Sequence, residues 1–346
     1  MDISENTMLS KIAIHFIGNK HEEESLQESR ELFQPEEELS NSLLKYFLSS
    51  FKGESFYTFL MEDLHAETKM LDIIENIFEN SDSLLENSVK LACHLYEQSS
   101  HPKVKSGEFY VVYFENCQIN GEEVEAIGLF KTEVKDPFLK VKMVDDHYEA
   151  FTDKGISLQK IDKGCLIYNH NKEEGYLIEM VDNTGKGSDA QYWKEDFLQL
   201  RPRQDEYFNT NHYLSMCKSF ITEELPEQYE ISKTDQIALL NRSVGYFKEN
   251  KDFDIDHFEK KVIGNPEVIQ EFNNFKETYQ QEKEVVLEDK FAISNSAVKK
   301  QNRIFRSVIK LDKNFHIYVH GNNELIEQGV DEKGRKYYKI YYTEEN

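Results

Sequence analysis

The chain has 346 residues, of which 39% are hydrophobic and 12% aromatic, so it is long enough for two or three domains and is not intrinsically disordered. Its 65 acidic and 41 basic residues give a formal net charge of −24, which argues against uniform attraction to nucleic acid. No apolar run reaches membrane-spanning length, and Met1–Ser10 lacks the apolar core of a secretory signal. We therefore expect a cytoplasmic protein with no membrane partner.

The cysteine pattern indicates structural thiols. The four cysteines are scattered, and none forms the close pair typical of a metal or redox site. A disulfide framework is unexpected in a long chain with so few cysteines. We expect buried, reduced side chains at Cys93, Cys117, Cys165 and Cys217.

The N-terminal region combines one strand with three helices. Met8–Ile17 alternates as a half-buried strand does. The next helix is expected to begin at Pro35, which suits a first turn, and Gly53 can end it. Apolar residues at helical spacing predict two more helices, at Leu71–Phe78 and Leu84–Tyr96.

The strongest pattern is the stretch Gly107–Glu133, which reads as two strands joined by a turn. Phe109–Phe114 is aromatic and β-branched without a charge, which predicts a strand buried on both faces. Asn120–Gly121 supplies the positive φ angles of a tight turn, and Val124–Phe130 returns with apolar character. We expect this hairpin to lie at the centre of a sheet.

Short strand-like runs follow the hairpin, with turn residues rather than helices between them. They are Phe138–Val144, Gly155–Ile161, Cys165–Asn169 and Tyr176–Val181. This order predicts an antiparallel meander, because parallel strands would need a helical crossover between them.

The chain becomes helical from Ala190. Helices are expected at Tyr192–Leu198, Tyr207–Ile221, Ser232–Phe247, Asp254–Ile263 and Pro266–Tyr279, with Ser232 and Asn265 as caps. Phe315–Val319 and Tyr337–Tyr342 are predicted to form a closing pair of strands. The fold expected is α+β: an antiparallel sheet with flanking helices, a helical middle region and a small β-containing C-terminal tail. The expected boundaries are residues 1–186, 187–290 and 291–346.

Positive charge is concentrated near the C-terminus. Phe291–Tyr342 carries a net charge of about +5, whereas the chain up to Lys290 carries about −27. Within Ala297–Lys313, here called the basic segment, one acid accompanies six cations: Lys299, Lys300, Arg303, Arg306, Lys310 and Lys313. Such density predicts contacts to the phosphates of nucleic acid, and screening over about 8 Å lets a local basic surface act on an acidic protein. The alternative is a basic surface that docks on the chain's own acidic surface or on a partner subunit.

A second candidate site is the Glu-x-Lys sequence formed by Glu133 and Lys135. Acids stand upstream at Glu115 and Glu125. Carboxylates followed by this motif hold the metal in many metal-dependent nucleases. Because 31% of the chain is charged, the motif also arises by chance, and a solvated strand end is the favoured interpretation.

Several stretches, in order along the chain, resemble the bacterial nucleoid-associated protein family NdpA, also called YejK. They are KIAIHFI at Lys11–Ile17, GEFYVVYF at Gly107–Phe114, DAQYWKEDFLQL at Asp189–Leu200, FHIYVHG at Phe315–Gly321 and YYKIYY at Tyr337–Tyr342. The resemblance covers essentially the whole chain. It implies nucleoid localisation, association with double-stranded DNA and contact with a type II topoisomerase, and it carries no catalytic residues.

We therefore predict a non-enzymatic nucleoid-associated protein that binds double-stranded DNA mainly through phosphates, with no metal and no cofactor. The six cations of the basic segment are the predicted contacts. One alternative is a protein-interaction module recruited through a DNA enzyme such as a type II topoisomerase, and the other is the nuclease. A homodimer is left open.

Overall fold

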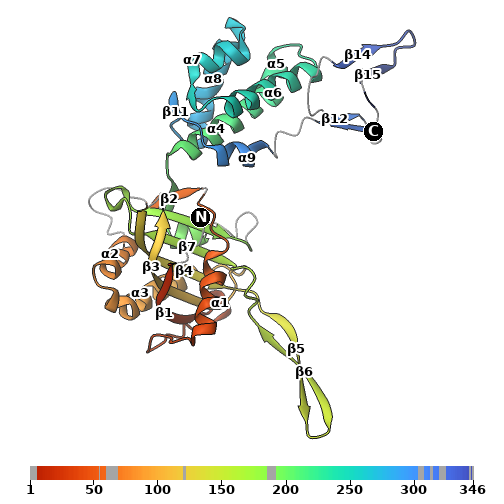
Figure 1. The fold of residues 1–346 in the computed structure, drawn as a ribbon. Coiled ribbons are helices and arrows are strands. Elements are labelled where there is room, and N and C mark those ends of the chain that lie inside the picture. The colour runs from red at the N-terminus through yellow and green to blue at the C-terminus, as the bar shows by residue number, and fades with distance from the viewer. Residues whose placement is uncertain are drawn as a thin grey trace. The chain divides into compact units, whose positions relative to one another are not determined.

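The structure, a computed structural model, describes residues 6–53, 55–59, 69–119, 122–184, 192–302, 308–311, 315–318, 325–342 and 344. The chain divides into two compact units, residues 1–203 and 204–346 (Figure 1). Each unit has a hydrophobic core of its own. The division into three parts at residues 186 and 290 stays a prediction.

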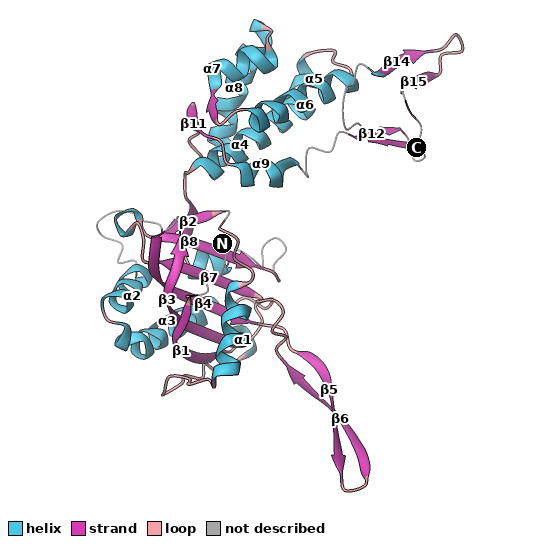
Figure 2. Ribbon diagram, in the orientation of Figure 1, coloured by secondary structure: helices cyan, strands magenta, loops and turns pink. Residues whose placement is uncertain are grey.

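The first unit is built on a seven-stranded antiparallel sheet (Figure 2). In spatial order its strands are β1 (Met8–Ile17), β3 (Gly107–Ile119), β4 (Glu122–Thr132), β7 (Lys163–Tyr168), β8 (Leu177–Asp182), β2 (Phe56–Phe59) and β9 (Leu200–Pro202). β3, β4, β7 and β8 are consecutive neighbours, so the predicted antiparallel meander is confirmed for the runs Cys165–Asn169 and Tyr176–Val181 that follow the hairpin. The α+β class with an antiparallel sheet is confirmed.

Helices cover both faces of this sheet. α1 (Glu37–Leu48) lies on one face, where Phe47 stacks on Phe130 at 4.4 Å, and α2 (Lys69–Glu79) and α3 (Leu84–Gln98) lie on the other (Figure 1). Successive side chains of β3 point to opposite faces. All of Phe109–Phe114 is therefore buried, as predicted.

The run Phe138–Val144 forms a strand outside the main sheet. β5 (Asp136–Val144) pairs with β6 (His147–Gly155) in a separate hairpin inserted between β4 and β7 (Figure 1). The sequence reading missed β6, whose residues are polar or exposed on both faces. The predicted strand Gly155–Ile161 is wrong beyond Gly155, because residues 156–162 form a loop that buries Ile161 against the sheet.

Three local expectations need correction. Pro35 precedes the N-cap residue Glu36 and so lies outside α1. α1 ends at Leu48, ahead of Gly53, although Gly53 does have φ +63°. Cys93 is exposed on α3, whereas Cys117, Cys165 and Cys217 are buried, and all four are free thiols. The predicted turn Asn120–Gly121 lies outside the described residues.

The second unit is mainly helical. Its described helices are α4 (Glu206–Ser219), α5 (Leu225–Gln228), α6 (Lys233–Glu249), α7 (Ile255–Phe258), α8 (Pro266–Lys283) and α9 (Asn295–Asn302). Both predicted caps are confirmed, since Ser232 accepts from the N–H of Asp235 at 3.1 Å and Asn265 from that of Glu267 at 2.9 Å. The short strands β10 (Asp252–Asp254) and β11 (Lys290–Ala292) pair in the core.

The tail contains two local hairpins. β12 (Val308–Leu311) pairs with β13 (Phe315–Tyr318), and β14 (Ile326–Val330) pairs with β15 (Lys336–Ile340). The predicted pairing of Phe315–Val319 with Tyr337–Tyr342 is therefore wrong, and each strand joins its neighbour in sequence, whose loop costs less entropy to close. Ile237 of α6 packs against side chains from both hairpins: Leu311, Ile317, Ile326 and Tyr338.

Candidate nucleic-acid interface

α9 presents the first two cations of the basic segment at the surface. Its inner face buries Ala297 and Val298. The Gln301 amide donates to Asn211 Oδ1 at 2.6 Å and to Ser215 Oγ at 3.0 Å, which ties α9 to α4. With the inner face fixed in this way, Lys299 and Lys300 are exposed.

The two lysines differ in their surroundings. Lys300 Nζ donates to the Tyr207 hydroxyl at 2.9 Å and lies 5.5 Å from the centre of that ring. This contact limits where the ammonium group can point without neutralising its charge. Lys299 makes no ion pair with the residues that the structure describes. The ammonium group of Lys299 is therefore open to an anion from solvent, and Lys300 is exposed next to it on the same helix.

The other predicted contacts are only partly covered by the structure. Lys310 belongs to β12, where its backbone pairs with His316. Its side chain lies outside the described part, as do Arg303, Arg306 and Lys313. The structure thus places two of the six predicted side chains and brings them together on one helix.

The turn between β14 and β15 adds an exposed cation at Lys333, and the first residue of β15, Lys336, is also exposed. Arg335 is also there, but its Nε donates to Asp331 Oδ2 at 2.7 Å. Hydrogen bonds from the backbone and side chain of Arg335 lower the pKa of Asp331, so this arginine is matched by a carboxylate. Lys333 and Lys336 are the better candidates for further phosphate contacts.

Comparison with known families identifies the chain. A family model described as nucleoid-associated protein YejK matches residues 13–334. The chain therefore belongs to the YejK family of nucleoid-associated proteins. This membership confirms the resemblance and gives the chain a nucleoid-associated role.

No curated protein matches the chain. No described helix has the length and apolar character needed to span a membrane.

In this YejK-family chain, the nuclease candidate Glu133 belongs to a buried ionic cluster. Its side chain is 5% exposed, and Glu133 Oε1 lies 3.1 Å from Lys131 Nζ and accepts from the Tyr192 hydroxyl at 2.7 Å. Beside this trio, Lys163 Nζ lies 2.7 Å from Asp182 Oδ2. Burial lowers the pKa of Lys131, and burial together with the Glu133 charge raises the pKa of Tyr192.

These contacts leave Glu133 poorly suited to a metal. Its carboxylate neutralises Lys131 and accepts a phenol hydrogen bond. Lys135 is half exposed and pairs with Glu108 at 2.5 Å, and Glu125 accepts from Asn169 at 3.2 Å. Among the described residues, no group of three or more His, Cys, Asp or Glu side chains could hold a metal ion. Glu133 therefore belongs to a buried ion cluster, which corrects the expected solvated strand end, and Lys135 belongs to a separate half-exposed pair. The spacing of the motif could not reveal either role.

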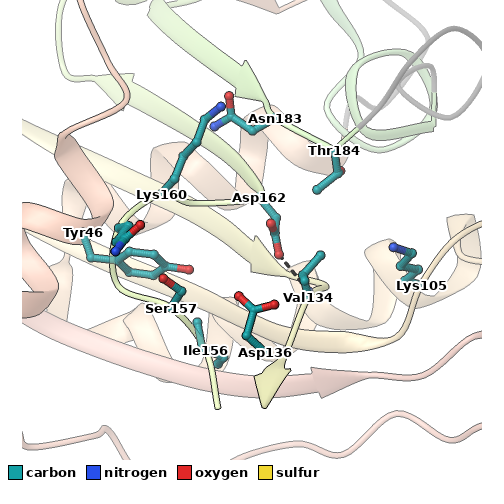
Figure 3. A pocket seen from close by; sticks show the side chains of 11 residues that line it. Tyr46, Lys105, Val134, Asp136, Ile156, Ser157, Lys160, Asp162, Asn183 and Thr184 are labelled. Carbon is teal, nitrogen blue, oxygen red and sulfur yellow. Dashed lines mark hydrogen bonds between the residues drawn. The ribbon is translucent and has the colours of Figure 1, made fainter. Parts of the chain in front are cut away.

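A pocket of about 430 Å³ adjoins this cluster (Figure 3). Asp162 Oδ2 accepts from the N–H groups of Glu133 at 2.6 Å and Val134 at 2.9 Å, and so closes one side of it. The charged lining residues are two lysines and two carboxylates: Lys105, Lys160, Asp136 and Asp162. This balance gives the pocket no excess positive charge for a phosphate, so α9 remains the candidate interface.

Proposed function

We propose that this chain binds double-stranded DNA through its basic segment, mainly by phosphate contacts and without catalysing a reaction. Membership of a nucleoid-associated family supports a role close to DNA. The observation that carries the proposal is the exposed pair Lys299 and Lys300 on a helix whose opposite face is held by hydrogen bonds. A fixed helix presents its charges with less loss of entropy than a free tail does.

The acidity of the remaining chain shapes this binding. A basic surface on a molecule of net charge −24 attracts a duplex only where the positive charges lie, because screening acts over about 8 Å. Elsewhere the chain repels the duplex, which limits nonspecific wrapping. Phosphate contacts position a protein without reading bases, so affinity should depend weakly on sequence.

A salt titration tests this proposal. Fluorescence anisotropy of two unrelated labelled duplexes, measured at several salt concentrations, gives the slope of log affinity against log salt. Six phosphate contacts predict a slope of about −5 for both sequences. A flat response would contradict binding through phosphates.

A second candidate function is an interaction module that reaches the nucleoid through a DNA enzyme, for which a type II topoisomerase is the proposed partner. The negative charge of the chain favours it, because an acidic surface can recruit a basic protein. This function predicts a flat salt response with naked duplex and binding to DNA only when the enzyme is present. Incubation of plasmid with Mg²⁺ or Mn²⁺ tests catalysis, and intact plasmid is the expected result.

A further inference from the structure

The hairpin β5–β6 has two chemically different faces. On one face, Lys140 lies 2.9 Å from Asp153 and Lys142 lies 3.9 Å from Glu149, so its charges are matched within the hairpin. The other face follows from the register, which places alternate residues of both strands together. We call it the apolar face, and its members are Pro137, Leu139, Val141, Met143, Tyr148, Ala150, Thr152 and Lys154.

The apolar face is open to solvent. Its large side chains Leu139, Val141, Met143 and Tyr148 are between 57% and 73% exposed. A lone two-stranded hairpin is marginally stable in water, and an exposed apolar patch of a few hundred Å² usually marks an interaction site. Burial of the apolar face against a partner would therefore stabilise this hairpin.

The charges of the hairpin indicate what that partner is. Its tip carries Asp145 and Asp146, both exposed, which argues against insertion into a DNA groove. The apolar face has no acidic side chain, so two copies of this acidic chain can meet there without placing carboxylates opposite one another. We propose that the apolar face is a dimerisation surface, on which the hairpin of a second copy packs antiparallel to the first.

The antiparallel arrangement matches charge as well as apolar surface. A twofold axis through the cross-strand pair Val141 and Ala150 brings Met143 and Tyr148 of one copy towards the base of the other. Lys154 lies four residues from Ala150 on the base side of the axis, and Asp146 lies four residues from Ala150 on the tip side. At about 3.4 Å per residue, both are about 14 Å from the axis, so each acidic tip lies beside the Lys154 of the other copy.

The area is sufficient for a specific contact. The four exposed apolar side chains offer about 500 Å² per copy, or about 1,000 Å² for the pair, which is the lower limit for a specific interface. Self-association in the micromolar range is therefore expected. This proposal does not rest on the DNA-binding proposal. It is tested by the mass of the protein in the absence of DNA.

Sedimentation equilibrium of the full chain up to about 100 µM tests the proposal, since an interface of this size should hold in that range. The wild-type chain should have twice the 40.8 kDa mass of one copy, and V141D should have the single mass, because it places two carboxylates at the axis. K142Q is the matched control, because Lys142 is the next residue along β5 and lies on the opposite, charged face. This variant should remain a dimer. Circular dichroism should show that V141D keeps the fold of the main sheet, since the hairpin lies outside it.

A charge exchange tests the antiparallel register. K154D and D146K alone should each weaken the dimer at least tenfold, whereas K154D/D146K, which has the wild-type net charge, should restore it. A wild-type monomer at every concentration, or a dimer that V141D leaves intact, would overturn the proposal. If V141D loses the dimer but K154D/D146K dimerises no more tightly than K154D or D146K alone, the antiparallel packing of the two hairpins would be overturned.

Discussion

The substitution Glu133→Gln tests the interpretation of the buried ionic cluster. It preserves the shape of the side chain and removes the carboxylate that faces Lys131, whose own side chain is 0% exposed. The Lys131 ammonium group keeps the Lys105 carbonyl at 2.6 Å and the Tyr192 hydroxyl at 3.1 Å, but its charge is no longer matched. Removing one partner of a buried ion pair costs about 3–5 kcal/mol.

This cost should appear as a lower melting temperature of the first unit. For a unit of this size, about 1 kcal/mol shifts Tm by about 2–4 °C, so E133Q should lower Tm by about 6–20 °C in calorimetry. K131M/E133Q, which removes both charges, should recover most of the loss. K135Q is the control, because Lys135 forms a half-exposed pair with Glu108 that contributes less than about 1 kcal/mol.

The pH dependence of the same variant gives an independent check. Burial holds the pKa of Lys131 below its ordinary 10.5 in the folded state, so the unfolded chain binds more protons between the two values. Stability contributed by this group therefore rises with pH through that window, and E133Q should widen the window towards lower pH. A Tm within about 2 °C of the wild type would refute the assigned role. Plasmid cleavage lost in a fully stable E133Q would show instead that Glu133 is catalytic.

Two further predictions concern buried titratable groups. His15 accepts from the Ser29 N–H at 3.1 Å and lies 2.8 Å from Ser88 Oγ, and burial lowers its pKa, so wild-type stability should fall as pH drops below 6.5 by up to about 1.4 kcal/mol per unit. Urea midpoints at several pH values should show this slope in the wild type and not in H15Q; equal slopes would contradict it. Glu179 accepts from the Tyr168 hydroxyl at 2.8 Å, and burial raises its pKa, so its contribution to stability should fall as pH rises above 4.5. E179Q should remove that fall, and an unchanged profile would show that Glu179 does not titrate in this range.

Strand identity could be predicted from sequence where local pattern decides it. Phe109–Phe114 is uncharged and buried on both faces, and the pattern leaves no other assignment. Alternation does not specify the partner of a strand, however. Phe138–Val144 therefore read as part of the meander although it pairs with β6, and the strands of the tail were paired with each other although each has a local partner.

The candidate interface was predictable in composition and not in arrangement. The density of cations in the basic segment predicted phosphate contacts at Lys299 and Lys300. Nothing in the pattern indicated that Gln301 would tie the helix to α4 and so fix which side of it faces solvent. The role of Glu133 was equally hidden, because its partner Tyr192 is far along the chain and the contact depends on the tertiary fold.

The central claim is that the exposed cations of α9 contact DNA phosphates, and a matched pair of variants tests it most directly. K299Q/K300Q and K260Q/K261Q each remove two exposed lysines from the second unit, and glutamine preserves helix propensity. At about 0.15 M salt each lost phosphate contact weakens binding about fivefold, so K299Q/K300Q should bind duplex DNA about 30-fold more weakly, with a salt slope reduced by about 2. K260Q/K261Q should match the wild type, and an equal effect of the two variants, or none of either, would contradict the account.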